Sequence, residues 1–391
     1  MKRKLKFIAL PLLLLLLAPT ASYAQLSCDN PPAPFNDDAL LANWQSVWDL
    51  TDVCKSAEGV FYEIISGGVG RDGIPPIDNP QFDDFEAADQ WLQPASPVIA
   101  VAVNGSARAY PLAILTRHEI ANDQIGDTAI AVTFCPLCNS AIVFNRQVGD
   151  AMLRFGVSGL LRNSDLIMWD DLTQSLWQQL TGEGIVGAYT GTLLDIIPSQ
   201  LVGYGAFKEQ YPQGQVLSAQ GRFYGRNPYV GYDSNAQPFL FAGTPDPRLP
   251  ATERVLALTI DGAGIAYPFS LLSEEIVIND SFADLEVVAL WQPGAFSALD
   301  AARIDESYDA GMAALFDRAI DGMALTFTIK DGEIVDEETG SVWNIFGSAI
   351  SGELAGTQLR TLNAFPHFWF AWAAFYPDTE IHGADTRSAE S

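Results

Sequence analysis

Histidine and basic residues are scarce in this chain, and both shortages limit what the protein can do. The 391 residues include 3 His and 21 Lys or Arg against 48 Asp or Glu, which gives a formal net charge of −27. Such an acidic chain repels phosphate backbones and anionic lipid, which argues against nucleic acid and acidic membranes as partners. A small molecule or another protein is the expected partner.

Motifs of several common enzyme classes are also absent. The sequence has no nucleophile elbow of a Ser-His-Asp hydrolase, no phosphate-binding loop and no dinucleotide-binding fingerprint. Beyond residue 18, no apolar run is long enough to predict a membrane helix. The chemistry is therefore expected among the few cysteines, histidines and buried carboxylates.

The first 24 residues have the organisation of a secretory signal. A basic start over Lys2–Lys6 precedes the apolar stretch Phe7–Ala18, and Ser22-Tyr23-Ala24 supplies a small-x-small cleavage site. The sequence therefore predicts export to the periplasm or the extracellular space, with a mature chain that begins at Gln25. Lipidation at Cys28 is less favoured, because the polar Gln25 stands where an aliphatic residue is expected.

The four cysteines fall into two pairs. Cys28 and Cys54 lie in a segment rich in Asn, Asp and Pro, and in an oxidising compartment they are expected to form a structural disulfide. Cys135 and Cys138 form a separate pair within the sequence CPLC. A local disulfide between these two is one alternative for the second pair.

The CPLC sequence lies between two strand-like stretches, residues 128–134 and 139–146, and no helix start signal follows it. A thiol-disulfide oxidoreductase places its cysteines at a helix N-terminus, where the dipole lowers the thiol pKa. Here the pair is expected in the turn of a β-hairpin, as a knuckle that presents two thiolates to one metal ion. Asn139 tolerates the positive φ that such a turn needs, and it excludes covalent haem attachment, which requires His there.

The chain contains a degenerate internal repeat. Residues 98–123 match residues 255–280, with Tyr110-Pro111 aligned on Tyr267-Pro268. The sequence therefore predicts an α+β, β-rich fold of two pseudosymmetric modules, each built mainly from antiparallel strands with short helices. The expected parts are a signal peptide (1–24), an N-terminal arm with the Cys28–Cys54 disulfide (25–96), a first module with CPLC (97–220), a linker rich in Gly, Pro and Tyr (221–253) and a second module without cysteines (254–384).

The repeat separates packing residues from candidates for function. CPLC aligns with Gln292-Pro293-Gly294-Ala295, so the turn is expected in both modules and the thiols in only one. His118-Glu119 aligns with Glu275-Ile276, so the imidazole and its neighbouring acid are also confined to the first module.

Four residues outside CPLC complete the candidate set. His118, on a helix expected over residues 114–122, offers a neutral nitrogen ligand, whereas Glu119 points about 100° away and is a candidate partner or general base. Asp165 follows a turn and is a candidate oxygen ligand or proton acceptor. His367, in an expected aromatic closing helix, can complete a site across the two modules. Each candidate also has a structural alternative. His118 can hydrogen-bond a backbone carbonyl, Asp165 can belong to a capped turn, and His367 can be a core residue.

Seven segments follow one another in the order typical of a known family. They are HEIAND from residue 118, VTFCPLCNSAIVF from 132, FGVSGLLRNSDLIMWD from 155, SLWQQ from 175, GRNPYVGYDS from 225, ERVLAL from 253 and FWFAWAAFYPDT from 368. Across residues 60–383 the chain resembles the DUF3179 family of exported bacterial and archaeal proteins. The resemblance implies export but no activity. The family pattern has Gly after the second Cys and Trp before the His, where this chain has Asn139 and Arg117.

Three hypotheses about the function follow, given in descending order of preference. In the first, Cys135, Cys138 and His118 hold one zinc or copper ion. Asp165, His367 or solvent then takes the fourth position, and Glu119 and Asp165 are the candidate catalytic residues. In the second, the two thiols cycle between dithiol and disulfide. In the third, the protein is a non-enzymatic exported binding module, so the sequence leaves open whether it is an enzyme.

Overall fold

The computed structural model describes residues 31–35 and 37–383, and this part of the chain is rich in antiparallel β-structure. Its helices are short, and α1 (Asp38–Gln45) has only 8 residues. The expected β-rich fold with short helices is therefore confirmed. Within the described ranges, no helix is long and apolar enough to cross a membrane.

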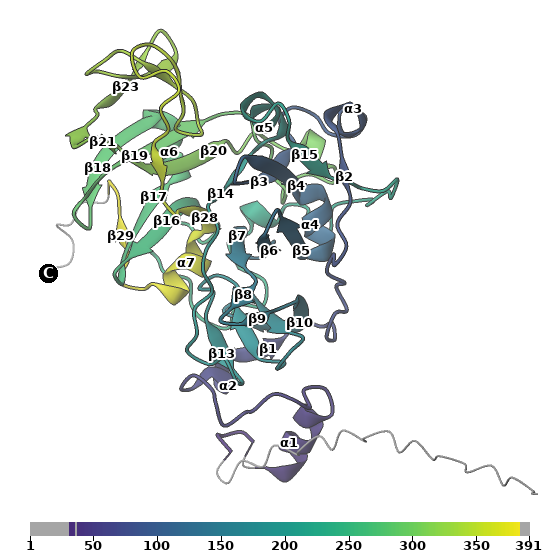
Figure 1. Cartoon of the computed structure of the whole chain (residues 1–391). Helices are drawn as coiled ribbons and strands as arrows, with labels where there is room; N and C mark the ends of the chain where they lie inside the picture. Colours follow the sequence, from purple (N-terminus) through teal and green to yellow (C-terminus); the bar gives the residue numbers. More distant parts are fainter. Residues whose placement is uncertain (1–30, 36, 384–391) are drawn as a thin grey trace, which may run out of the picture.

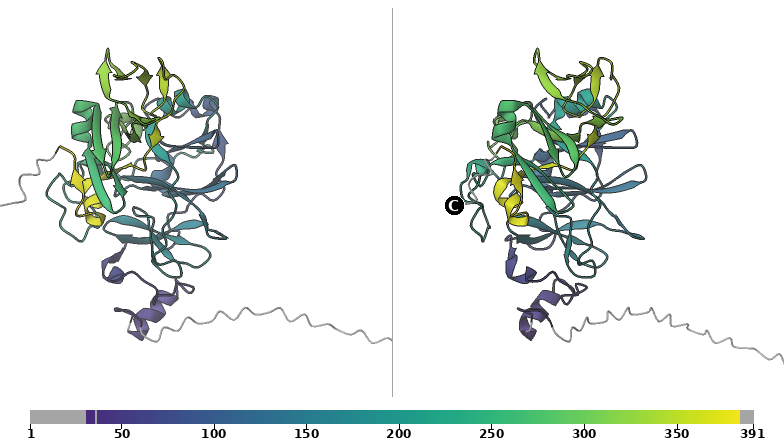
Figure 2. Two further views of the ribbon diagram at one scale, coloured as in Figure 1. Left: turned by 60° about the vertical axis from the view of Figure 1, so that its left-hand side comes forward. Right: turned by 90° about the vertical axis from the view of Figure 1, so that its left-hand side faces the viewer.

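The N-terminal arm lies at one end of the molecule and extends along the body (Figures 1 and 2). Its strand β1 (Ile64–Ser66) adds an edge to the sheet β1-β10-β11-β12-β13, whose other strands lie within residues 155–186. Its strand β2 (Phe82–Asp83) adds an edge to the sheet β14-β3-β4-β15-β2, whose other strands lie within residues 97–111 and 199–217. After α1, its elements are α2 (Val60–Glu63), β1 (Ile64–Ser66), β2 (Phe82–Asp83) and α3 (Phe85–Ala88).

The strands of the first half, residues 97–217, belong to four sheets, one of which is the two-stranded pair at residues 147–152. Besides the two just given, β5, β6 and β7 form a small antiparallel sheet that carries the CPLC turn. The elements are β3 (Pro97–Val103), β4 (Ser106–Pro111), α4 (Leu112–His118), β5 (Ile120–Ile125), β6 (Thr128–Cys135), β7 (Ser140–Asn145), β8 (Gln147–Val148), β9 (Ala151–Met152), β10 (Phe155–Arg162), β11 (Asp165–Asp170), β12 (Leu176–Gln178), β13 (Gly184–Val186), β14 (Ser199–Gly203), α5 (Tyr204–Gln210) and β15 (Gln215–Leu217).

The second half, residues 254–381, is drawn in green and yellow in Figure 1. Its elements are β16 (Arg254–Ile260), β17 (Ala263–Pro268), α6 (Phe269–Glu275), β18 (Val277–Phe282), β19 (Leu285–Gln292), η2 (Ile304–Glu306), β20 (Met312–Asp317), β21 (Ala319–Ile320), β22 (Met323–Ala324), β23 (Phe327–Lys330), β24 (Glu333–Asp336), β25 (Val342–Trp343), β26 (Ala349–Ser351), β27 (Arg360–Thr361), β28 (Phe365–Phe368), α7 (Trp369–Phe375) and β29 (Glu380–Ile381).

The pairing of the strands follows one scheme in the two halves. The antiparallel hairpin β3–β4 is flanked by antiparallel β14 and parallel β15, and the hairpin β16–β17 is flanked by antiparallel β28 and parallel β29. A short helix follows each hairpin, and each half then continues with an antiparallel three-strand set, β5–β6–β7 or β18–β19–β20.

The helix α4 is shorter than the sequence predicts, because it ends at His118 and not near residue 122. Pro111 precedes its first turn, where the missing N–H costs no helical hydrogen bond. Glu119 then adopts φ of 57° and reverses the chain into β5. Ile276 does the same after α6, with φ of 65°. Adjacent residues at such a reversal point into different parts of the protein.

The closing segment of the second half also differs from the expectation. The helix α7 begins only at Trp369, and His367 lies in β28, which pairs with β16. Pro366 favours an extended strand over a helix here, because it lacks the backbone N–H that a helix interior needs. The strand places this segment against the first half, since the Phe368 N–H donates to the Cys138 carbonyl at 2.8 Å.

A turn equivalent to CPLC does not occur in the second half, which corrects the expectation of a shared turn. Residues 136–139 connect β6 to β7, whereas residues 293–311 connect β19 to β20 and contain η2. The long connection returns to the end of the N-terminal arm, where the Phe296 N–H donates to the Ala95 carbonyl at 2.8 Å.

The linker between the halves, residues 221–253, packs onto both of them. Tyr232, in η1 (Tyr232–Ser234), is 8% exposed and contacts Phe368 with ring centroids 6.0 Å apart. Phe241 contacts Phe370 with ring centroids 5.2 Å apart. On the first half, the Ser164 hydroxyl donates to the Phe239 carbonyl of the linker at 2.5 Å. The proposed signal peptide and Cys28 lie outside the described residues, so the signal and the Cys28–Cys54 disulfide stay predictions.

Asn122 joins β5 to β10, and its loss is expected to destabilise the fold. Its side-chain amide donates to the Phe155 carbonyl at 2.8 Å, and its side-chain oxygen accepts from the Phe155 N–H at 2.9 Å. Asn122→Ala leaves both buried backbone groups unpaired, so urea denaturation should show a loss of about 2–3 kcal/mol in the free energy of unfolding.

Asn279 is the matched control for this prediction. It makes the same pair of bonds to Phe327 but is exposed. Water can replace its side chain, so Asn279→Ala should cost less than Asn122→Ala. Equal losses for the two variants would contradict the argument from burial.

Candidate metal centre

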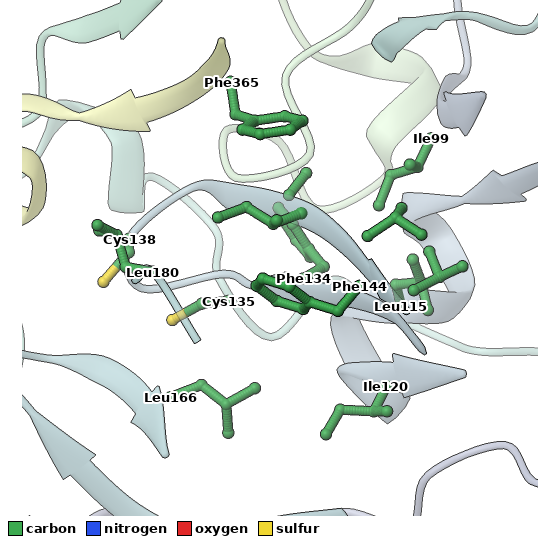
Figure 3. Close-up of a cluster of buried hydrophobic side chains, with 14 of the residues drawn as sticks. Ile99, Leu115, Ile120, Phe134, Cys135, Cys138, Phe144, Leu166, Leu180 and Phe365 are labelled. Carbon is green, nitrogen blue, oxygen red and sulfur yellow. The ribbon is translucent and has the colours of Figure 1, made fainter. Parts of the chain in front are cut away.

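The CPLC turn closes the β6–β7 hairpin in the way the sequence predicts. Cys135 pairs with Ser140, the Cys138 N–H donates to the Cys135 carbonyl at 3.2 Å, and Asn139 has φ of 49°. Both thiols are free, with Cys135 2% and Cys138 0% exposed. Figure 3 shows the two sulfur atoms on the same side of the turn, facing the strand that carries Leu166.

Asp165 reaches the thiols because the β10–β11 hairpin is unusually long. Its strands have 8 and 6 residues, whereas the corresponding strands β23 and β24 in the second half have 4 each. The added length carries Asp165 to the CPLC turn. A sulfur of Cys135, a sulfur of Cys138 and a carboxylate oxygen of Asp165 all lie within 4.8 Å of one another.

The Asp165 carboxylate is only half satisfied by the protein. Its Oδ2 accepts from Gln178 Nε2 at 2.6 Å and from the Leu180 N–H at 2.9 Å. Its Oδ1 is buried and has no hydrogen-bond partner among the described residues. An unpartnered buried carboxylate oxygen is costly, so Oδ1 is poised for a ligand.

Other buried polar atoms around the turn also lack partners within the described chain. They are Asn139 Nδ2, Ser140 Oγ, Gln178 Oε1, Gln179 Oε1 and His367 Nδ1. The sequence reasoning did not single out the two glutamines. One signal was present, because Gln179 corresponds to the apolar Ile345 when SLWQQ is placed on SVWNI. Such a concentration of unsatisfied groups is typical of a site that holds an ion or ordered water.

Burial controls the protonation of the site. It raises the pKa of both thiols, most strongly for Cys138, and it raises the pKa of Asp165 to about 6. Burial, with the charge of Asp165 as a second cause, raises the pKa of Glu119 to about 8. At neutral pH the two thiols and Glu119 therefore keep their protons, and a cation bound at the turn would displace those of the thiols.

Glu119 connects the buried centre to a cavity of about 380 Å³. Leu137 of the CPLC turn, Leu166 beside Asp165 and Tyr232 of the linker line the same cavity. Among the described residues that line this cavity, Glu119 is the one charged residue, and the other polar side chains are two tyrosines and Asn235. The arm closes one side tightly, since a Cβ on Gly159 (φ 79°) would lie 2.2 Å from the Val69 carbonyl oxygen.

The structure does not bring His118 to the thiols, which corrects its expected place among the metal ligands. Its Nδ1 lies 2.7 Å from the Pro75 carbonyl oxygen, and its ring contacts Tyr224 with centroids 5.7 Å apart. It lines a different cavity, of about 360 Å³. The reversal at Glu119 is the reason, because it directs the two adjacent side chains into separate cavities.

His367 lies near the turn but outside the group formed by the thiols and Asp165. It is 1% exposed and stacks on Trp372, with ring centroids 5.2 Å apart. Burial lowers its pKa to about 3, so the imidazole is neutral.

The comparisons with known proteins agree with the resemblance seen in the sequence. The model of DUF3179, described as a protein of unknown function, matches residues 71–379. The chain belongs to the DUF3179 family. No curated protein matches the chain, and no solved structure does. The matched range of this DUF3179 protein includes CPLC, Asp165 and Glu119, so the candidate centre lies within the part that defines the family.

Proposed function

We propose that this DUF3179 protein holds one zinc ion between Cys135, Cys138 and Asp165. The observation that carries the proposal is the mutual approach of their ligand atoms within 4.8 Å, together with the unpartnered Asp165 Oδ1. Zinc accepts both sulfur and carboxylate oxygen, whereas Cu(I) prefers soft sulfur ligands alone. The mixed donor set therefore favours zinc over copper.

The ligand set is that of a catalytic site and not of a closed structural one. Three protein ligands leave one position of a tetrahedral ion for water or substrate. When bound, zinc supplies a Lewis acid and an activated water. Glu119, with its pKa near neutrality, is suited to take up or release the proton.

The cavity beside Glu119 indicates the kind of substrate. Its wall is formed mainly by aliphatic residues such as Val157 and Leu161, with Tyr229 and Tyr232 as polar points. A volume of about 380 Å³ admits a small molecule. We therefore favour hydrolysis of a small, mainly apolar substrate as the reaction class.

We also propose that the protein is exported, on the strength of residues 1–24, and that its two halves arose by duplication. The repeated strand pairing supports the duplication, and the division at residues 97–220, 221–253 and 254–384 follows from it. Under this proposal only the first half developed the metal centre, through the CPLC turn and the longer β10–β11 hairpin.

A thiol-redox function is the second candidate, and the thiol environment argues against it. Redox cysteines need a lowered pKa, but burial raises the pKa of Cys135 and Cys138, and no helix begins at the turn. Iodoacetamide should therefore alkylate the metal-free folded protein slowly at pH 7, with the rate still rising above pH 9. Urea-unfolded protein is the control for intrinsic reactivity. A fast reaction with a midpoint below pH 8 would favour the redox function.

Elemental analysis of the purified protein, with a free-thiol count, tests the main proposal. We expect about one equivalent of zinc, and two thiols that are protected until a chelator is added. Protein without metal, in which Cys135 and Cys138 form a disulfide, would refute it.

A further inference from the structure

A cavity of about 980 Å³ lies away from the metal centre. The N-terminal arm, α4, the linker and residues 302–305 of the second half enclose it. Neither the proposed zinc ligands nor Glu119 lines it. A volume of this size lies within the range of small-molecule binding sites. The charge and polarity of its wall therefore indicate the class of ligand that it binds.

The charge of this wall is opposite to that of the chain. Four arginines and two aspartates are its charged residues, a net of +2 where the whole chain has −27. Arg303 is paired with Asp305 at 2.5 Å. The other three, Arg117, Arg222 and Arg226, form no ion pair with a carboxylate of the described residues.

Eight of the 13 arginines in the described part of the chain form an ion pair with a carboxylate. Three of the five that do not form one lie on this wall. Arg117 is also oriented, since its Nη2 donates to the Arg226 carbonyl. Guanidinium groups that line a cavity without a carboxylate partner are suited to bind a carboxylate or phosphate through paired hydrogen bonds.

Aromatic and aliphatic side chains form the rest of the wall. Trp91, Tyr224 and Ile304 line it, and Phe223 is 92% exposed. A phenyl ring that is almost wholly exposed beside a cavity offers apolar area that a ligand can cover. The ligand should therefore carry an apolar body as well as a negative group.

We propose that this cavity binds a small organic oxyanion, a carboxylate or a phosphate attached to an aromatic or aliphatic body. Arg117, Arg222 and Arg226 bind the negative group, and Trp91 and Phe223 pack on the body. The site does not depend on zinc, because it shares no residue with the metal centre.

Calorimetric titration of the full chain with three probes tests the proposal. The probes are 2-naphthoate, 2-naphthyl phosphate and the neutral 2-naphthamide. At least one anion should bind at a single saturable site, about tenfold or more tightly than the amide, because a charge-assisted hydrogen bond is lost with the charge. The tighter anion identifies the negative group as carboxylate or phosphate.

Variants locate the binding. The double variant Arg117→Gln/Arg226→Gln, and separately Phe223→Ala, should each weaken the better anion, by about tenfold or more for the double variant. Arg360→Gln, on an arginine outside the cavity, and Asp165→Asn should leave it unchanged. An unchanged circular dichroism spectrum and an unchanged urea midpoint show that the variants are folded, whether or not they hold zinc. The proposal would be overturned if 2-naphthamide bound as tightly as both anions, or if no probe bound saturably. It would also be overturned if the double variant Arg117→Gln/Arg226→Gln bound the better anion as tightly as the unmodified chain does.

Discussion

Replacement of Cys135 or Cys138 by Ser is expected to abolish stoichiometric zinc, and Asp165→Asn is expected to weaken zinc binding by about 100-fold. The estimate divides the binding free energy of a structural zinc site among its ligands. Asp165→Asn preserves the shape of the side chain and an oxygen that can accept from Gln178 and Leu180. It removes the negative charge opposite the thiols, so the loss reports on the metal and not on the hairpin. Competition with a coloured zinc chelator measures the affinity.

Glu333→Gln is the matched control for Asp165→Asn. Glu333 is the first residue of β24, as Asp165 is of β11, but it is exposed and lies on the short hairpin of the second half. Its replacement should leave zinc affinity unchanged. If Asp165→Asn and Glu333→Gln bind zinc equally well, the carboxylate is not a ligand. If Cys135→Ser keeps full zinc, the centre is not at the CPLC turn.

Glu119→Gln should make the metal-free protein less sensitive to pH while leaving zinc stoichiometry intact. The pKa of Glu119 is raised from 4.5 to about 8 in the folded state. Between these values the folded chain keeps a proton that the unfolded chain has released. The free energy of unfolding therefore falls as pH rises through this window, by up to about 1.4 kcal/mol per pH unit.

Urea denaturation of both proteins from pH 5 to pH 9 measures this effect. The stability of Glu119→Gln relative to the unmodified chain should grow as pH rises to about 8 and then level off. The window from about pH 6 to 8 is the cleanest, because the pKa of Asp165 is raised only to about 6. Glu275→Gln, an exposed acid at the end of α6, is the control and should show no trend. If the free energy of unfolding of Glu119→Gln changed with pH in parallel with that of the unmodified chain, Glu119 would already be ionised below pH 8, which would contradict its raised pKa.

The sequence contains enough information to predict the CPLC hairpin. Apolar, β-branched residues on both sides of the turn and Asn at the position with positive φ are local signals, and local signals decide a hairpin. Asp165 was a candidate because it follows a turn directly after an apolar strand, although the second half also carries an acid, Glu333, at the corresponding position. These predictions depended on residues that are close in the chain.

The sequence could not place the two histidines, because their positions depend on chain reversals and on contacts between distant segments. The positive φ of Glu119, a residue that rarely adopts it, turns His118 toward the arm and Glu119 toward the metal centre. His367 was assigned to a helix because its aromatic neighbours suggest a buried face, but pairing with β16 makes the segment a strand. Gln178 and Gln179 were missed because the burial of an unpartnered amide leaves only a weak trace in a single sequence, here the Gln179 that stands where the repeat has Ile345.

Zinc K-edge X-ray absorption of the purified protein tests the central claim most directly. The account predicts two sulfur neighbours at about 2.3 Å and lighter oxygen or nitrogen neighbours at about 2.0–2.2 Å in one shell. The same spectrum of Asp165→Asn should keep both sulfur neighbours. A shell without sulfur, or one with four sulfurs, would contradict a centre built from Cys135, Cys138 and Asp165.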